Sequence, residues 1–125
     1  MLASVRSATV LVVEDDPQVR EMYQMALGSR YQVVLAGDGL TALTIIDQKL
    51  PDVVVLDLGL PRVSGWDVYR DLRARAETQQ LPVIVATARD ARDIRKDEVA
   101  AFLHKPVDPY ALVAAVDQAL GRIGG

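Results

Sequence analysis

Two short apolar runs in this sequence end on carboxylates. Glu14 and Asp15 follow the run 8–13, and Asp57 follows the run 53–56. If these acids converge in the fold, they repel one another by ~1 to 4 kcal/mol per pair at 4 Å, depending on the effective dielectric. Mg²⁺ would compensate their charge, because it takes oxygen ligands and keeps several waters. Without a metal, one of the carboxylates should have a raised pKa.

Two further polar residues stand at the ends of later apolar runs. Thr87 ends the run 81–87, and Lys105 follows the run 99–104. A hydroxyl group can donate to one phosphoryl oxygen and an ammonium group can hold another, while an ionised Asp57 could act as the nucleophile. Acids, hydroxyl and ammonium are therefore the parts of a site for phosphoryl transfer.

The apolar runs are predicted to be buried strands of one sheet. They are rich in aliphatic and β-branched residues and bounded by turn residues, which is typical of strands covered on both faces. Five strands are expected, over residues 8–13, 31–36, 53–57, 81–87 and 99–104.

Amphipathic helices are predicted between the strands. Asp16, Asp38, Ser64 and Asp108 stand where helices should begin, and apolar residues recur after them at helical spacing. The inner faces are assigned to Val19, Met22, Tyr23, Ala26 and Leu27; to Leu40, Leu43, Ile46 and Leu50; to Val68, Tyr69 and Leu72; and to Leu112, Val113, Val116, Ala119, Leu120 and Ile123. The charged segment 88–98 has one strong apolar residue, so any helix there should be short.

Strands that alternate with helices predict an α/β fold, in which one doubly wound parallel sheet carries helices on both faces. Because parallel strands end at the same edge, the polar residues after the runs should meet there, and open α/β sheets bind ligands at that edge. The chain has 125 residues, of which 50% are hydrophobic, and this fits a single compact domain.

Composition argues against several other classes of protein. A formal net charge of −3 leaves no basic surface for nucleic acid. No segment is long and apolar enough to span a membrane, and the absence of cysteine is compatible with the cytosol. We therefore expect a cytoplasmic protein without membrane insertion and without direct binding to nucleic acid.

The chain resembles the receiver domains of bacterial two-component response regulators, the CheY-like superfamily, over residues 8–122. The matching motifs are LVVEDD at 11–16, DLGLP at 57–61 with Gly65, ATA at 86–88 and KP at 105–106. The resemblance implies a flavodoxin-like, five-stranded sheet in strand order 2-1-3-4-5. Residues 1–7 would be an N-terminal extension and residues 123–125 a C-terminal tail, with no output domain.

The resemblance also implies the roles of the acids. In the family, the residue that matches Asp57 accepts a phosphoryl group from a phosphohistidine on a histidine kinase or a histidine phosphotransfer protein. Asp15, Asp57 and the carbonyl of Gly59 would bind Mg²⁺ directly, and Glu14 would act through a water molecule. Asp16 is expected to serve as a helix N-cap instead of a further ligand.

Two residues are implied to switch the conformation after phosphorylation. In the family, the residue that matches Thr87 moves toward a phosphoryl oxygen, and the aromatic residue that matches Phe102 turns inward into the space it leaves. Lys105 would hold another phosphoryl oxygen. The chain is thus expected to be a phosphoacceptor that assists its own phosphoryl transfer and dephosphorylation, not a dedicated enzyme, and to alter binding of a downstream protein.

Some features depart from the family's pattern. Fewer residues than usual separate Thr87 from Lys105, so the fourth helix is expected to be shortened or unwound. Gly59 has no side chain to position or exclude a hydrolytic water. With no output domain, the chain would be a stand-alone receiver or one excised from a larger protein. An alternative therefore stays open, in which the chain is a receiver-fold interaction module that signals without phosphorylation.

Overall fold

The computed structural model describes residues 7–88, 95 and 98–121. The predictions for the N-terminal extension 1–7, for the C-terminal tail 123–125 and for a shortened helix within 88–98 therefore fall almost wholly outside the described residues.

The predicted parallel sheet is confirmed, with five strands in the order β2-β1-β3-β4-β5 and every neighbouring pair parallel. The strands are β1 (Thr9–Val13), β2 (Gln32–Ala36), β3 (Val53–Leu56), β4 (Val83–Thr87) and β5 (Ala101–His104). Several begin one or two residues later than expected. Before β2, the Tyr31 amide donates to the carbonyl of Leu27 at 2.9 Å, in the turn that follows the preceding helix.

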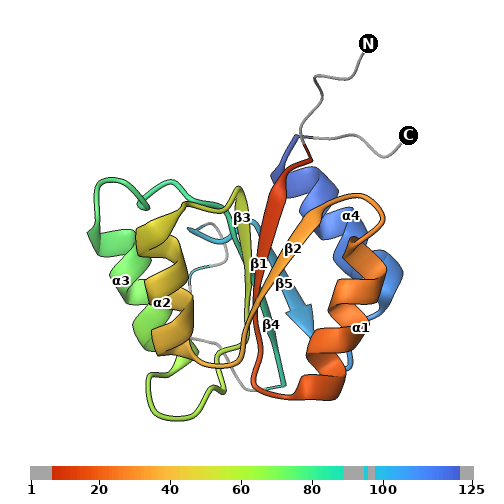
Figure 1. Cartoon of the computed structure of the whole chain (residues 1–125), viewed down its shortest axis with the longest axis horizontal. Coiled ribbons are helices and arrows are strands. Elements are labelled where there is room, and N and C mark those ends of the chain that lie inside the picture. Colours follow the sequence, from red (N-terminus) through yellow and green to blue (C-terminus); the bar gives the residue numbers. More distant parts are fainter. Residues whose placement is uncertain (1–6, 89–94, 96–97, 122–125) are drawn as a thin grey trace.

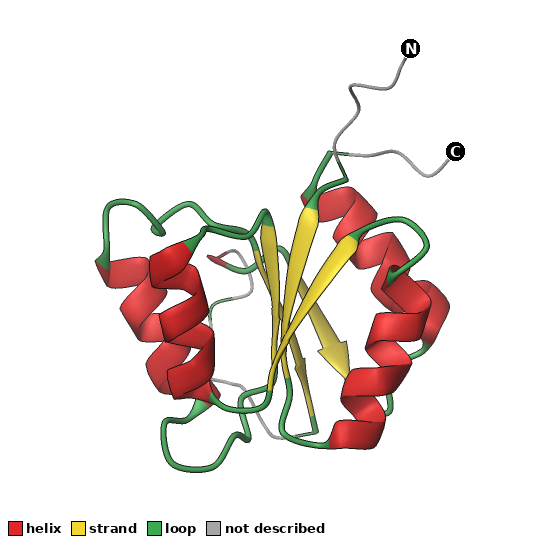
Figure 2. Cartoon of the chain, in the orientation of Figure 1, coloured by secondary structure: helices red, strands yellow, loops and turns green. Residues whose placement is uncertain are grey.

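Two helices cover each face of the sheet. The helices α1 (Pro17–Leu27) and α4 (Pro109–Ala119) lie on one face, and α2 (Gly39–Gln48) and α3 (Gly65–Ala74) lie on the other (Figure 1, Figure 2). The predicted N-caps are confirmed: the side chains of Asp16, Asp38, Ser64 and Asp108 each accept a hydrogen bond from a backbone amide in the first turn. This doubly wound arrangement places all five strand ends at one edge.

A separate hydrophobic core fills each side of the sheet. In β1, Val10 and Val12 pack toward α1 and α4, whereas Leu11 and Val13 pack toward α2 and α3. The central strand β3 is buried along its whole length, as expected of a strand covered on both faces. The backbone at the end of β3, which leads into Asp57, is therefore packed on both faces by the two cores.

The predicted inner face of α2 is wrong at two positions. Leu40 is 65% exposed and Leu50 is 48% exposed, whereas Gly39, Ala42 and Ile46 are buried. A Cβ at Gly39 would lie 2.5 Å from the carbonyl oxygen of Val63. The first turn of α2 thus packs this glycine closely against the loop between β3 and α3. Leu40 then points outward, and Leu50 lies beyond the end of the helix.

The final helix also ends earlier than expected. It stops at Ala119, and Gly121 adopts a φ of 70°, which favours glycine and does not continue a helix. Ile123, assigned to its inner face, lies outside the described residues. Among the helices of the described part of the chain, none has the length and apolar character needed to cross a membrane.

Candidate phosphoacceptor and metal site

Asp57 follows β3 directly and lies at the carboxyl edge of the sheet. Its amide donates to the carbonyl of Val13 at 3.1 Å, which continues the pairing with β1. Its Oδ1 accepts a hydrogen bond from the amide of Gly59 at 3.0 Å. The side chain is buried, so the Gly59 amide and the surrounding backbone fix the orientation of the carboxylate.

The three predicted acids meet at this edge. Carboxylate oxygens of Glu14, Asp15 and Asp57 all lie within 4.8 Å of one another. Glu14 is buried, and one of its oxygens accepts a hydrogen bond from the amide of Asp16 at 3.0 Å, whereas Asp15 is exposed. These donors fit Mg²⁺, because all are hard oxygen ligands and the exposed acid leaves room for the waters that the ion keeps.

Lys105 joins two of these acids. Its Nζ donates to Oδ2 of Asp57 at 3.1 Å and also to Oε1 of Glu14. The proximity of Lys105 to Asp57 was expected, but the contact with Glu14 was not. Glutamate has a longer side chain than aspartate, and this greater reach is the one sequence signal that could have suggested the contact.

The buried charges change the acidity of both partners. Burial raises the pKa of the Glu14 carboxyl above its usual range, and the hydrogen bonds from Lys105 and the Asp16 amide only partly offset that effect. This confirms the expectation that one acid of the cluster has a raised pKa. For Lys105, burial lowers the pKa, but the hydrogen bonds to Glu14 and Asp57 outweigh it, so that the pKa is raised and the ammonium stays charged.

The family model for response regulator receiver domains matches residues 10–117, which include every residue of this site. The chain belongs to this family. It is 41% identical to TcrX of Mycobacterium tuberculosis over 93% of the chain and 51% of that protein. It is 36% identical to the response regulator PleD of Caulobacter vibrioides over 88% of the chain and 25% of that protein. The receiver thus spans about half of TcrX and a quarter of PleD.

Solved receiver structures share the fold. The chemotaxis response regulator CheY4 of Vibrio cholerae superposes with a TM-score of 0.80 at 26% identity, covering 91% of this chain and 99% of that one. A response regulator receiver domain from Clostridium thermocellum gives a TM-score of 0.81 at 26% identity, covering 91% and 94%. Receiver domains are the regulatory phosphoacceptors of two-component signalling and bind Mg²⁺ in general.

The two residues of the expected switch lie on neighbouring strands of this receiver. Thr87 is the last residue of β4 and is fully buried. Its carbonyl accepts a hydrogen bond from the amide of Lys105 at 3.1 Å. Phe102 lies on β5 and packs against the core under α2 and α3, with its ring centroid 5.1 Å from that of His104. These positions are compatible with the switch, which stays a prediction.

One residue near the acids was missed by the sequence analysis. Arg20 lies one turn into α1, and its Nη1 donates to the carbonyl oxygens of Glu14 at 2.9 Å and of Asp15 at 3.2 Å. The sequence offered only an arginine on the polar side of a predicted helix, and such residues usually contact solvent.

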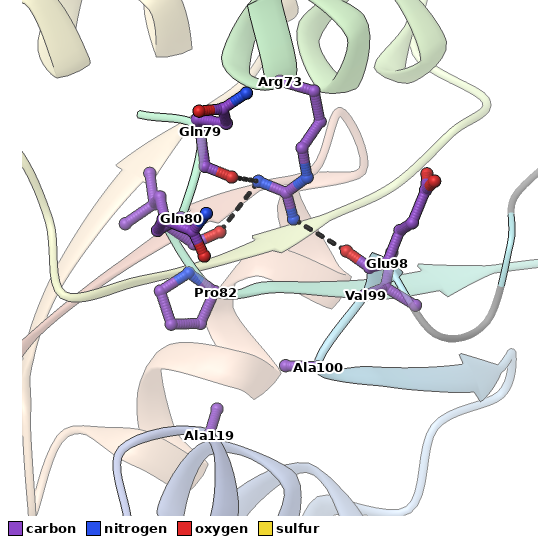
Figure 3. Close-up of a pocket in the computed structure, with 9 residues that line it drawn as sticks. Arg73, Gln79, Gln80, Pro82, Glu98, Val99, Ala100 and Ala119 are labelled. Atoms are coloured by element: carbon purple, nitrogen blue, oxygen red, sulfur yellow. Dashed lines mark hydrogen bonds between the residues drawn. The ribbon is translucent and has the colours of Figure 1, made fainter. Parts of the chain in front are cut away.

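One hollow in the described part of the chain lies away from the acids. It measures about 560 Å³ and sits at the opposite edge of the sheet, where β4 and β5 begin (Figure 3). Arg73 donates there to the carbonyls of Gln79 at 3.3 Å, Leu81 at 3.0 Å and Glu98 at 2.9 Å. Arg73 thereby ties the segment before β4 to the segment before β5.

Proposed function

We propose that Asp57 is the phosphoacceptor of this receiver and takes its phosphoryl group from a phosphohistidine on a histidine kinase or histidine phosphotransfer protein. The main support is the position of its carboxylate, which is held by the Gly59 amide on one oxygen and by Lys105 on the other. A nucleophile held in this way loses little freedom when it reacts.

The transfer itself needs one bond to form and one to break. A carboxylate oxygen of Asp57 attacks phosphorus, the P–N bond of the phosphohistidine breaks, and its electron pair returns to the imidazole nitrogen. The Lys105 ammonium, whose Nζ lies 3.1 Å from Oδ2 of Asp57, would then hold a phosphoryl oxygen. The Thr87 hydroxyl would donate to another phosphoryl oxygen.

Asp15, Asp57 and the Gly59 carbonyl would hold Mg²⁺ directly, and Glu14 would hold it through a water molecule. The ion, when bound, supplies charge that screens the carboxylates from the incoming phosphoryl oxygens. The closeness of the three carboxylates supports this ligand set.

Phosphorylation would be read through Thr87 and Phe102. The movement of Thr87 toward the phosphoryl group frees space, and an inward turn of Phe102 changes the surface beside β5 that a downstream protein contacts. On this proposal the chain acts in the cytoplasm as a phosphoacceptor that assists its own transfer and dephosphorylation, and does not bind nucleic acid directly.

The test is uptake of label from acetyl [³²P]phosphate with and without Mg²⁺. We expect the wild-type chain to take up label only with Mg²⁺, and Asp57→Asn to take up none. Asp52→Asn is the matched control, because Asp52 lies at the other end of the same strand and is exposed. A wild-type chain that takes up no label would contradict the proposal, and partner binding that ignores Asp57→Asn and Mg²⁺ would favour the phosphorylation-independent module.

A further inference from the structure

Arg20 reaches from α1 back across the turn that carries two acids of the site. Its Nη1 lies 2.9 Å from the carbonyl oxygen of Glu14 and 3.2 Å from that of Asp15. Gly37, at the end of the neighbouring strand, leaves space for the guanidinium, since a Cβ there would lie 3.0 Å from Nη1. The group is therefore fitted between the turn and the strand instead of extending into solvent.

The two carbonyls belong to the peptide planes on either side of the Asp15 Cα. Because each peptide is planar, holding both carbonyls fixes φ and ψ of Asp15, and with them the direction of its Cβ. The carbonyl of the next residue, Asp16, accepts a hydrogen bond from the Arg20 backbone amide at 2.9 Å. This third bond from Arg20 further restrains the turn. The exposed Asp15 carboxylate is thus aimed largely by the backbone that Arg20 holds.

We propose that Arg20 is a positioning residue for Mg²⁺ binding, acting through the backbone of Glu14 and Asp15 and touching neither the metal nor the phosphoryl group. The inference rests on the proposed function, because it takes Asp15 as a direct ligand. Partners that orient metal ligands commonly affect affinity by ~10- to 100-fold.

Charge and position have opposite effects on Mg²⁺ affinity, which makes the proposal testable. The guanidinium is always charged, so its removal by itself would strengthen the binding of a cation. Loss of the two carbonyl contacts would weaken binding. At ~1 M KCl the Debye length falls to about 3 Å, and the charge effect is largely suppressed while the positioning effect remains.

The experiment is a MgCl₂ titration in ~1 M KCl, followed by the amide NMR signals of Asp15, Asp16 and Gly59. We expect Arg20→Gln to bind Mg²⁺ about tenfold more weakly than wild type. Arg20→Lys keeps the charge but ends one atom short of the terminal guanidinium nitrogens, and its affinity should fall between those of Arg20→Gln and wild type. Arg70→Gln is the matched control, because Arg70 is a largely exposed arginine on α3, and it should bind like wild type.

A second measurement needs no metal. In EDTA, the amides of Asp15 and Asp16 should exchange with solvent faster in both Arg20 variants than in wild type, whereas the strand amides of β3 should be unchanged. Mg²⁺ affinities equal to wild type in both variants, or tighter binding by Arg20→Gln, would overturn the inference. The proposed function fails separately, if wild type takes up no phosphoryl label.

Discussion

Gly65, the first residue of α3, lies against the backbone of Asp57: a Cβ on Gly65 would stand 2.0 Å from the Asp57 carbonyl oxygen. A glycine-to-alanine change in a helix ordinarily stabilises by roughly 0.5–1 kcal/mol. Here overpacking should dominate and cost about 1–3 kcal/mol, with a shift of the loop that carries Asp57. We expect Gly65→Ala to unfold at lower urea and to take up phosphoryl label more slowly at saturating Mg²⁺. Stability and labelling equal to wild type would show that the loop can move aside freely.

Replacing Lys105 should lower the free energy of unfolding, because two buried acids then lack a cation. Lys105→Met leaves Glu14 and Asp57 facing each other without a cation, and we expect a loss of about 3 kcal/mol at pH 7. Burial already raises the pKa of Glu14, and removal of Lys105 raises it further. A carboxyl whose pKa is raised in the folded state destabilises that state when ionised, so the loss should shrink as pH falls toward the unfolded value of 4.5.

The measurement for this prediction is urea unfolding between pH 7 and pH 5 in EDTA. Lys49→Met is the matched control, because Lys49 is exposed at the end of α2. A loss that is independent of pH would indicate that the methionine variant suffers from poor packing and not from uncompensated charge.

Tyr23 carries a buried hydroxyl that has no hydrogen-bond partner within the described part of the chain. An unsatisfied buried polar group costs about 1–3 kcal/mol, so Tyr23→Phe should be more stable than wild type by about 1 kcal/mol at pH 7. Tyr110→Phe, at a site that is 86% exposed, should be neutral. Urea unfolding of both variants provides the comparison, and a less stable Tyr23→Phe would reveal a partner for the hydroxyl.

The same tyrosine should shape stability at high pH. Burial raises the pKa of Tyr23 from 10.0 to about 12. Ionisation of Tyr23 therefore has no effect on stability below pH 10, and it destabilises the folded state by roughly 2–3 kcal/mol as pH rises toward 12. Tyr23→Phe should lack this part of the alkaline loss, which unfolding curves at pH 9 and pH 11 would measure. An equal alkaline loss in both proteins would assign it to other groups.

Arg73 should matter for stability and not for phosphorylation. Its guanidinium binds three carbonyls at the hollow of Figure 3 and lies 5.1 Å from the Tyr69 ring centroid. Lysine cannot reproduce this planar fork, so Arg73→Lys should cost about 1–2 kcal/mol and speed exchange of the Ala100 amide. Arg70→Lys, on the exposed side of the same helix, serves as the control. Slower labelling from acetyl phosphate in Arg73→Lys would contradict the separation of the two edges.

The fold was predictable because its evidence is local and repeated. Each strand is a short apolar run, each helix has a capping residue and helical spacing, and parallel strands must end at one edge. That rule alone predicts that Asp57, Thr87 and Lys105 lie close to the acids after β1.

The errors and omissions depend on approaches between distant residues. Leu40 is exposed because Gly39 packs against the backbone of Val63, a contact that helical spacing does not encode. The bond between Lys105 and Glu14 joins residues 91 positions apart and depends on the reach of two particular side chains. Arg20 donates to backbone carbonyl oxygens, and their directions cannot be predicted from the sequence pattern.

Glu14 and Asp57 share the ammonium of Lys105, and this affects which parts of the structure respond to a change at Asp57. Glu14 and Asp57 compete for one cation, so a group added to Asp57 that draws Lys105 toward itself loosens the hold on Glu14. The ends of β1, β3 and β5 are thereby linked by a single positive charge. A group added to Asp57 would therefore alter the contacts of the turn into α1 as well as those at the end of β5. Two separate surfaces of the receiver would then change together.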